Sequence, residues 1–340
     1  MNGKERCLAV LRGETPDRVP LFPLMMFFAA GRAGISYSRF STDAAALADA
    51  QLNLFENYGV DAITACSDSY RISADLGGEI VLPDGDGTPY LARPLVACEA
   101  DLDRLNLHPD PVKKGSRMAQ RVDSVAQMAR AAGREALVVG WVEMPFAEVC
   151  EWFGLQQCLT ELFDEPELVH RALEAAAAME IDYAAAQLEA GADMIGCGDA
   201  AASLLSPALY EEFAYPYEKA VTDGIHRLGG LVKLHICGDS THLLPRLPQV
   251  GADLNNVDHM VDLAAARDAY TAAGLAFKGN VDPLAGLRSA APEQAREAAA
   301  KCVGLCRGTR YMLSCGCEIP KDTPDESYWA FAEAAGVRRR

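Results

Sequence analysis

The chain has 340 residues, half of them apolar, and a net charge of −17 at pH 7. This apolar fraction is typical of a globular protein, and the acidity argues against nucleic acid as a partner. No apolar stretch approaches the ~20 residues of a membrane span, and we recognise no signal peptide. The 11 cysteines lack a disulfide-like spacing, which favours reduced thiols and a cytoplasmic location.

Short apolar runs alternate with long Ala-, Leu- and Glu-rich stretches along the chain. The longest helical stretch, residues 166–189, has Asp164 as its expected N-cap. Eight strand–helix units favour an α/β fold with a closed parallel sheet, the (β/α)8 TIM barrel, over an open doubly wound sheet. The predicted strands are residues 19–24, 61–66, 136–141, 193–197, 231–236, 253–257, 276–281 and 311–314.

Residues 79–96 interrupt this alternation. They read as a strand, a Gly/Asp/Pro turn at residues 83–87 and a second strand, which predicts a β-hairpin inserted into the second loop of the barrel. The chain has no linker, low-complexity stretch or internal repeat, so we expect residues 1–340 to form a single domain.

Two short segments carry most of the chemical information, Leu-His235-Ile-Cys237-Gly and Ser-Cys315-Gly-Cys317-Glu. His235 and Cys237 alternate along the fifth predicted strand and therefore point the same way, and Cys317 follows the eighth. Reactive groups of such barrels lie at the C-terminal ends of strands. One imidazole and two thiolates can hold zinc with one coordination position open, whereas magnesium and calcium prefer oxygen. The alternative is a core histidine beside two buried cysteines.

Two residues affect how this ligand set is completed. Cys315 competes with Cys317 as third ligand; we favour Cys317 because it lies beyond the strand, next to the flexible Gly316. Asp258 follows the sixth predicted strand and could be a fourth ligand that a substrate thiol displaces. For Asp258 the alternative is an N-cap or a salt bridge.

Other charged residues are predicted near the same rim. Asp68 ends the second predicted strand and could bind a cationic group or steer a proton. Arg32 follows the first strand and could bind a substrate carboxylate or sulfonate. Glu143 closes the third strand and is a further candidate. For Asp68 and Arg32, the alternative is an ordinary salt bridge.

Three segments resemble the uroporphyrinogen decarboxylase superfamily: residues 16–20 (Pro-Asp-Arg-Val-Pro), 279–283 (Gly-Asn-Val-Asp-Pro) and 316–324, which runs from Gly-Cys-Glu to Thr-Pro. The resemblance extends over residues 4–335 and implies a single (β/α)8 barrel. The superfamily contains porphyrinogen decarboxylases and corrinoid-dependent methyltransferases.

The chain departs from the decarboxylases at two motifs. Their Met-Arg-Gln-Ala-Gly-Arg segment, whose arginines grip substrate carboxylates, reads Phe-Phe-Ala-Ala-Gly-Arg here, so Phe28 replaces the first arginine. Their histidine before the final Thr-Pro helix corresponds to Cys317. Asp68 matches the decarboxylase aspartate and keeps uroporphyrinogen decarboxylation as an alternative.

His235-x-Cys237 with Cys317 instead is similar to the zinc motif of the methylcobamide:coenzyme M methyltransferases, with Asp258 where that branch has a carboxylate. This resemblance implies methyl transfer between a corrinoid and a small substrate, most simply a thiol held as a zinc thiolate. The opposite direction, from a methoxylated or other methyl donor to cob(I)alamin, stays open.

The chain has no Asp-x-His-x-x-Gly cobalamin motif, so the cobalamin is expected on a separate corrinoid protein. Alternatively, the protein is not an enzyme but a noncatalytic metal- or corrinoid-binding module. A structural zinc ion in such a module would be expected to have four protein ligands and no open position. Barrels with exposed helices often dimerise, so a homodimer is one expectation, although no face is indicated.

Overall fold

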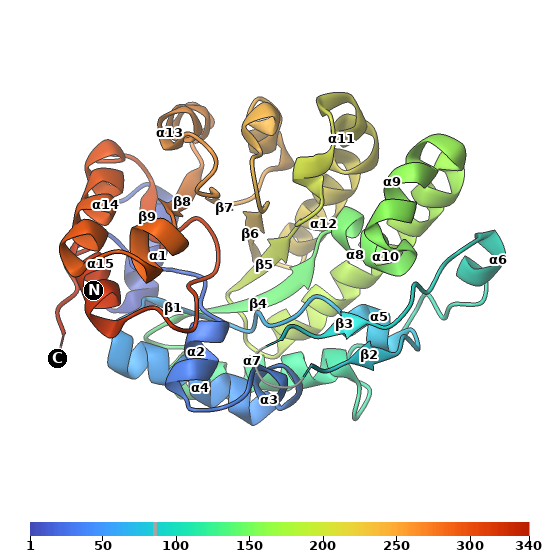
Figure 1. Cartoon of the computed structure of the whole chain (residues 1–340), viewed down its shortest axis with the longest axis horizontal. Helices are drawn as coiled ribbons and strands as arrows, with labels where there is room; N and C mark the ends of the chain where they lie inside the picture. The colour runs from blue at the N-terminus through green and yellow to red at the C-terminus, as the bar shows by residue number, and fades with distance from the viewer. Residues whose placement is uncertain (84–86, 340) are drawn as a thin grey trace.

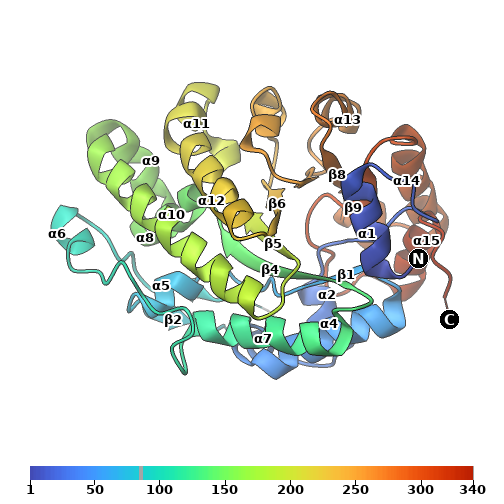
Figure 2. The same ribbon diagram turned by 180° about the vertical axis from the view of Figure 1, so that it is seen from behind.

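The computed structural model describes residues 1–83 and 87–339. Its centre is a curled parallel sheet surrounded by helices (Figures 1 and 2). The strand order follows the chain, and each strand pairs in parallel with the next. The strands are β1 (Ala62–Thr64), β4 (Leu137–Glu143), β5 (Met194–Gly198), β6 (Leu231–His235), β7 (Leu254–Asn256), β8 (Ala276–Val281) and β9 (Tyr311–Cys315).

The eighth position of the barrel is occupied by residues 19–24, which make only isolated bridges. Leu21 and Leu24 bridge to the β9 side, and the Leu21 carbonyl accepts from the Asp61 amide beside β1 at 2.9 Å. The predicted strand is reduced because Pro20 and Pro23 have no N–H to donate to a ladder. The segment still joins both edges, so the prediction of a (β/α)8 barrel is confirmed.

The helices cover the outside of the sheet. The prediction for residues 166–189 is confirmed, because α10 spans Pro166–Glu189, but the predicted N-cap is wrong: Asp164 ends the preceding helix and Glu165 is the single residue between the two. The helices are α1 (Gly3–Arg12), α2 (Phe27–Arg32), α3 (Tyr37–Thr42), α4 (Ala44–Tyr58), α5 (Arg71–Asp75), α6 (Glu99–Leu102), α7 (Arg117–Ala132), α8 (Pro145–Phe153), α9 (Leu155–Asp164), α10, α11 (Pro207–Phe213), α12 (Tyr215–Arg227), α13 (Leu263–Ala272), α14 (Pro292–Leu305) and α15 (Asp325–Glu333). No helix of the described residues is long and apolar enough to cross a membrane.

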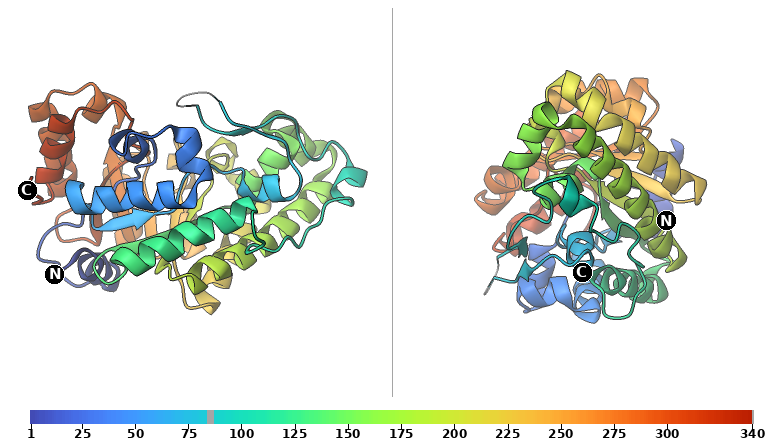
Figure 3. Two further views of the ribbon diagram at one scale, coloured as in Figure 1. Left: turned by 90° about the horizontal axis from the view of Figure 1, so that it is seen from below. Right: turned by 90° about the vertical axis from the view of Figure 1, so that its right-hand side faces the viewer.

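The predicted hairpin is present after α5. β2 (Ile80–Val81) and β3 (Tyr90–Leu91) pair antiparallel. The predicted turn lies partly outside the described residues, since residues 84–86 are not among them. The hairpin and α6 lie toward the end of the molecule opposite the two termini (Figures 1 and 3).

The sheet separates two layers of core. Val232, Leu234 and Ile236 of the β6 segment belong to the large cluster packed under the helices. A smaller cluster around Phe22 joins Cys7 and Val10 of α1 to side chains of six strands: Ala62, Leu137, Val139, Met194, Leu254, Ala276 and Met312. Because successive strand residues point to opposite faces, the odd-numbered residues of β6 face the barrel interior.

Candidate metal centre

His235, Cys237 and Cys317 converge at the C-terminal rim. His235 is the last residue of β6, Cys237 follows it by two residues, and Cys317 lies two residues beyond β9. The His235 Nε2 lies 3.1 Å from the Cys237 Sγ, and the two sulfur atoms are 3.8 Å apart. One ligand atom from each residue fits within 4.8 Å of the others. The three residues predicted as ligands therefore form one cluster.

The loop after β9 reaches this cluster because Gly316 lets it lie against the loop after β7. A Cβ on Gly316 would sit 2.1 Å from the backbone nitrogen of His259, a distance that no side chain tolerates. The Asn256 side-chain amide donates to the Gly316 carbonyl at 2.9 Å. Backbone packing and one buried hydrogen bond thus place Cys317 opposite Cys237.

The two thiols interact directly. The contact with Cys237 lowers the pKa of Cys317 to about 3, whereas the same contact, followed by burial, raises the pKa of Cys237. The contact between the sulfurs therefore favours the ionised form of Cys317 over that of Cys237. The Nδ1 of His235 is buried and has no hydrogen-bond partner among residues 1–83 and 87–339. The polar groups of this cluster are not fully satisfied by the protein alone.

The donor set matches zinc. Two thiolates on a tetrahedral zinc ion, with Zn–S bonds of ~2.3 Å, have sulfurs about 3.8 Å apart, the separation seen between Cys237 and Cys317. Imidazole and thiolate are soft to borderline ligands that suit zinc. Both cysteines are only half-buried, so an incoming group can approach a fourth position.

Cys315 is not part of the cluster. It ends β9, is buried, and belongs to the core under the helices. Burial raises the pKa of its thiol well above the usual value. The structure therefore brings Cys317 rather than Cys315 to the other two ligands, as the sequence predicts.

Asp258 lies beside the cluster but outside the group of three. Its carboxylate is buried, and the Oδ1 accepts from the Met260 amide at 2.9 Å and lies 2.9 Å from the His259 Nδ1. Its charge is close enough to raise the pKa of Cys237. The role of Asp258 as a fourth ligand stays a prediction.

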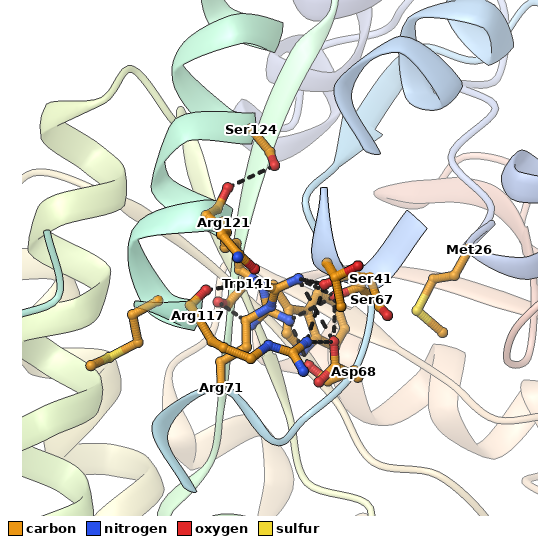
Figure 4. Close-up of polar contacts among 12 residues, drawn as sticks. Met26, Ser41, Ser67, Asp68, Arg71, Arg117, Arg121, Ser124 and Trp141 are labelled. Atoms are coloured by element: carbon orange, nitrogen blue, oxygen red, sulfur yellow. Dashed lines mark hydrogen bonds and ion pairs between the residues drawn. The ribbon is translucent and has the colours of Figure 1, made fainter. Parts of the chain in front are cut away.

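Asp68 is held in a network of arginines (Figure 4). Its Oδ2 lies 2.8 Å from the Arg117 guanidinium and 3.7 Å from that of Arg71, while Arg121 donates to its carbonyl at 2.6 Å. Burial raises the pKa of Asp68, but the charges of these three arginines outweigh it and lower the pKa overall. Oδ2 is thus held in ion pairs, whereas Oδ1 is buried without a hydrogen-bond partner among the described residues, and a role of Asp68 toward substrate stays a prediction.

Arg32 is likewise engaged by the protein. Its guanidinium pairs with Asp325 at 2.6 Å and donates to the carbonyls of Lys321 and Thr323 at 3.2 and 2.6 Å. These contacts tie α2 to the segment before α15. The structure does not bring Arg32 into the metal-ligand cluster, and its contact with substrate stays a prediction.

Two residues near the site were not singled out by the sequence. Glu318 follows Cys317 and accepts from the Met26 and Phe27 amides, with a shortest distance of 2.7 Å to each, which anchors the ligand loop to the start of α2. Lys233 stands two residues before His235 and shares its side of β6. The same alternation that predicts the ligand pair indicates that Lys233 points inward.

The fold and the site together define an α/β barrel whose C-terminal rim carries residues that could hold a soft metal ion. The family model described as uroporphyrinogen decarboxylase (URO-D) matches residues 2–337, and the chain belongs to this family.

Relatives from both branches match. Methylcobamide:CoM methyltransferases MtbA of Methanosarcina acetivorans and Methanosarcina mazei are 28% and 29% identical, each over 98% of this chain and 97% of their own. A uroporphyrinogen decarboxylase of Synechococcus sp. is 29% identical over 82% of this chain and 79% of its own.

The solved structure of a methyltransferase from Methanosarcina mazei has a TM-score of 0.89 at 21% identity, covers 99% of this chain and 98% of its own, and supports the fold. The comparisons confirm the resemblance to the family and to its branch similar to the methylcobamide:CoM methyltransferases.

Proposed function

We propose that this protein is a zinc-dependent methyltransferase that moves a methyl group between a corrinoid carried by a separate protein and a small thiol. The observation that carries the proposal is the three-residue cluster of one imidazole and two cysteine sulfurs at the rim of the barrel. The names of the full-length Methanosarcina relatives support corrinoid-dependent methyl transfer. The reduced thiols that this requires fit a cytoplasmic setting.

In this proposal His235, Cys237 and Cys317 hold the zinc and leave one position for the substrate. Bound zinc would lower the pKa of the substrate thiol and keep it as a thiolate near neutral pH. The Gly316 and Asn256 contacts hold the loop that carries Cys317 in place. A fixed Cys317 would in turn fix the direction from which a substrate sulfur approaches the open position. The corrinoid would supply the methyl group: the sulfur–carbon bond would form as the cobalt–carbon bond breaks, and the electron pair of that bond would stay with the corrinoid.

Two observations favour methyl transfer over porphyrinogen decarboxylation. Asp68, which matches the decarboxylase aspartate, is buried in ion pairs with Arg71 and Arg117. Phe28, which replaces the substrate-binding arginine, is fully buried against Tyr58 and Tyr328. The Oδ2 of Asp68 is already paired with arginines, and Phe28 offers no cation to a substrate with eight carboxylates.

The test is zinc content together with methyl transfer. The reduced full-length protein is expected to hold about one zinc per chain and to methylate a small thiol, such as coenzyme M, from free methylcobalamin. A protein that binds no zinc after reconstitution, or that turns over uroporphyrinogen in the presence of a chelator, would contradict the proposal. Methyl transfer only from an ether or amine to cob(I)alamin would reverse the direction.

A further inference from the structure

Lys233 places a cation inside the barrel directly below the ligand cluster. The residue is 1% exposed. Its Nζ lies 4.4 Å from the ring centroid of Trp141 and 5.7 Å from that of Phe22. Val232 and Leu234 on either side face the helices, so the lysine chain runs into the interior rather than out to solvent.

No carboxylate neutralises this ammonium. Within the described part of the chain, no Asp or Glu oxygen lies within 4.0 Å of Nζ. The carboxyl nearest to the same indole is Glu143, whose Oε1 accepts from the Trp141 ring nitrogen at 2.8 Å. Burial raises the pKa of Glu143 to about 8 and lowers the pKa of Lys233 to about 8, so burial disfavours the charged form of both groups. Two aromatic faces compensate only part of the cost of a buried charge.

The groups that could supply the missing negative charge are sulfur atoms. The backbone of Lys233 lies two residues, ~7 Å, from that of His235 on the same side of β6, and the His235 Nε2 is 3.1 Å from the Cys237 sulfur. Cys317 and Cys237 are the two proposed zinc ligands. A zinc ion with two thiolates and a neutral imidazole has no net charge, and a third, substrate thiolate makes the centre −1.

We infer that Lys233 supplies the counter-charge for the thiolate-loaded zinc centre and thereby selects an anionic sulfur ligand over a neutral ether or amine. This inference rests on the proposed function. Lys233 acts through space on the bound substrate and is a positioning residue. Because methylation converts the thiolate to a neutral thioether, the same charge favours the substrate over the product.

The test uses the zinc-loaded full-length protein and 2-mercaptoethanol, a thiol with no other charge. Lys233→Met keeps most of the side-chain volume and removes the charge, whereas Lys113→Met removes an exposed lysine as the matched control. We expect equal zinc content in all proteins and, by calorimetric titration, at least about tenfold weaker thiol binding in Lys233→Met alone.

X-ray absorption at zinc gives a readout that a merely structural role would not change. At one thiol concentration the wild type should gain a third sulfur ligand, and Lys233→Met should remain at two. Lys233→Gln serves as a second variant if the methionine variant fails to fold.

The results distinguish a failure of the proposed function from a failure of the role of Lys233. A wild type without zinc or without thiol binding overturns the proposed function. A wild type that binds both, with thiol affinity unchanged within twofold in Lys233→Met and Lys233→Gln, overturns the role of Lys233 alone.

Discussion

The metal-ligand cluster (His235, Cys237 and Cys317) and the Asp68 network both follow the C-terminal ends of strands, yet they bring together different kinds of side chain. In the cluster, two half-buried thiols contact each other and His235 Nδ1 has no partner within the described residues. In the network, the Oδ2 of Asp68 is paired with Arg117 and Arg71. A position at the rim is therefore not sufficient for metal binding; soft ligand atoms from separate strands meet in the cluster, whereas a carboxylate and guanidinium groups meet in the network.

The strongest test of this difference is Cys317→Ala. Removing one of three ligands should abolish stoichiometric zinc binding and reduce methyl transfer at least ~10³-fold, measured by elemental analysis and by turnover of methylcobalamin. The matched control is Cys315→Ala, two residues away and outside the cluster. It should keep zinc and activity and lose only ~1–2 kcal/mol of stability from its buried position. Loss of zinc in Cys315→Ala instead would contradict the assignment.

Asp68→Asn should have the opposite phenotype. The change leaves the buried Arg71 and the partly buried Arg117 without their carboxylate, which typically costs ~3–5 kcal/mol of unfolding free energy, while zinc content stays at the wild-type value. Denaturant unfolding measures the loss. Asp322→Asn, which breaks an exposed pair with Arg288, should cost less than ~1 kcal/mol. An unaltered unfolding curve for Asp68→Asn, with lost activity, would place Asp68 in the chemistry.

Asp258→Ala tests the edge of the cluster. If Asp258 is a fourth ligand or orients one of the other ligands, its removal should weaken zinc affinity by about 10- to 100-fold. Competition with a chelator measures this affinity. Asp268→Ala, which removes an exposed carboxylate beside Arg267, is the control and should bind zinc as the wild type does. Equal chelator resistance in both variants would remove Asp258 from the metal centre.

Glu143→Gln examines the strand between the two regions. Burial raises the pKa of Glu143 to about 8, so between pH ~4.5 and 8 the folded state holds a proton that the unfolded state releases. Its stabilising contribution is present at low pH and is lost as the pH rises through about 8. From pH 6 to 9, the wild type should lose ~2–3 kcal/mol relative to Glu143→Gln, seen as a larger fall in melting temperature. Parallel curves would exclude a raised pKa.

Local patterns in the sequence predicted much of the architecture. Alternating apolar runs placed the barrel strands, and Pro20 and Pro23 explain why the first is reduced to bridges. The His235-x-Cys237 spacing and the Gly beside Cys317 predicted the three residues that the structure brings together. These features depend on strand periodicity and backbone freedom, which neighbouring residues determine.

Only the tertiary structure decided which charged residues are already paired. Asp68 meets Arg117, 49 residues away, and Arg32 meets Asp325, 293 residues away. The lack of a carboxylate beside Lys233 within the described chain is equally a product of packing. Sequence alone determined which way the side chains of β6 point and which residue types could bind a soft metal. Ion pairs and their absence arise from distant segments that the closed barrel brings together, so no local pattern encodes them.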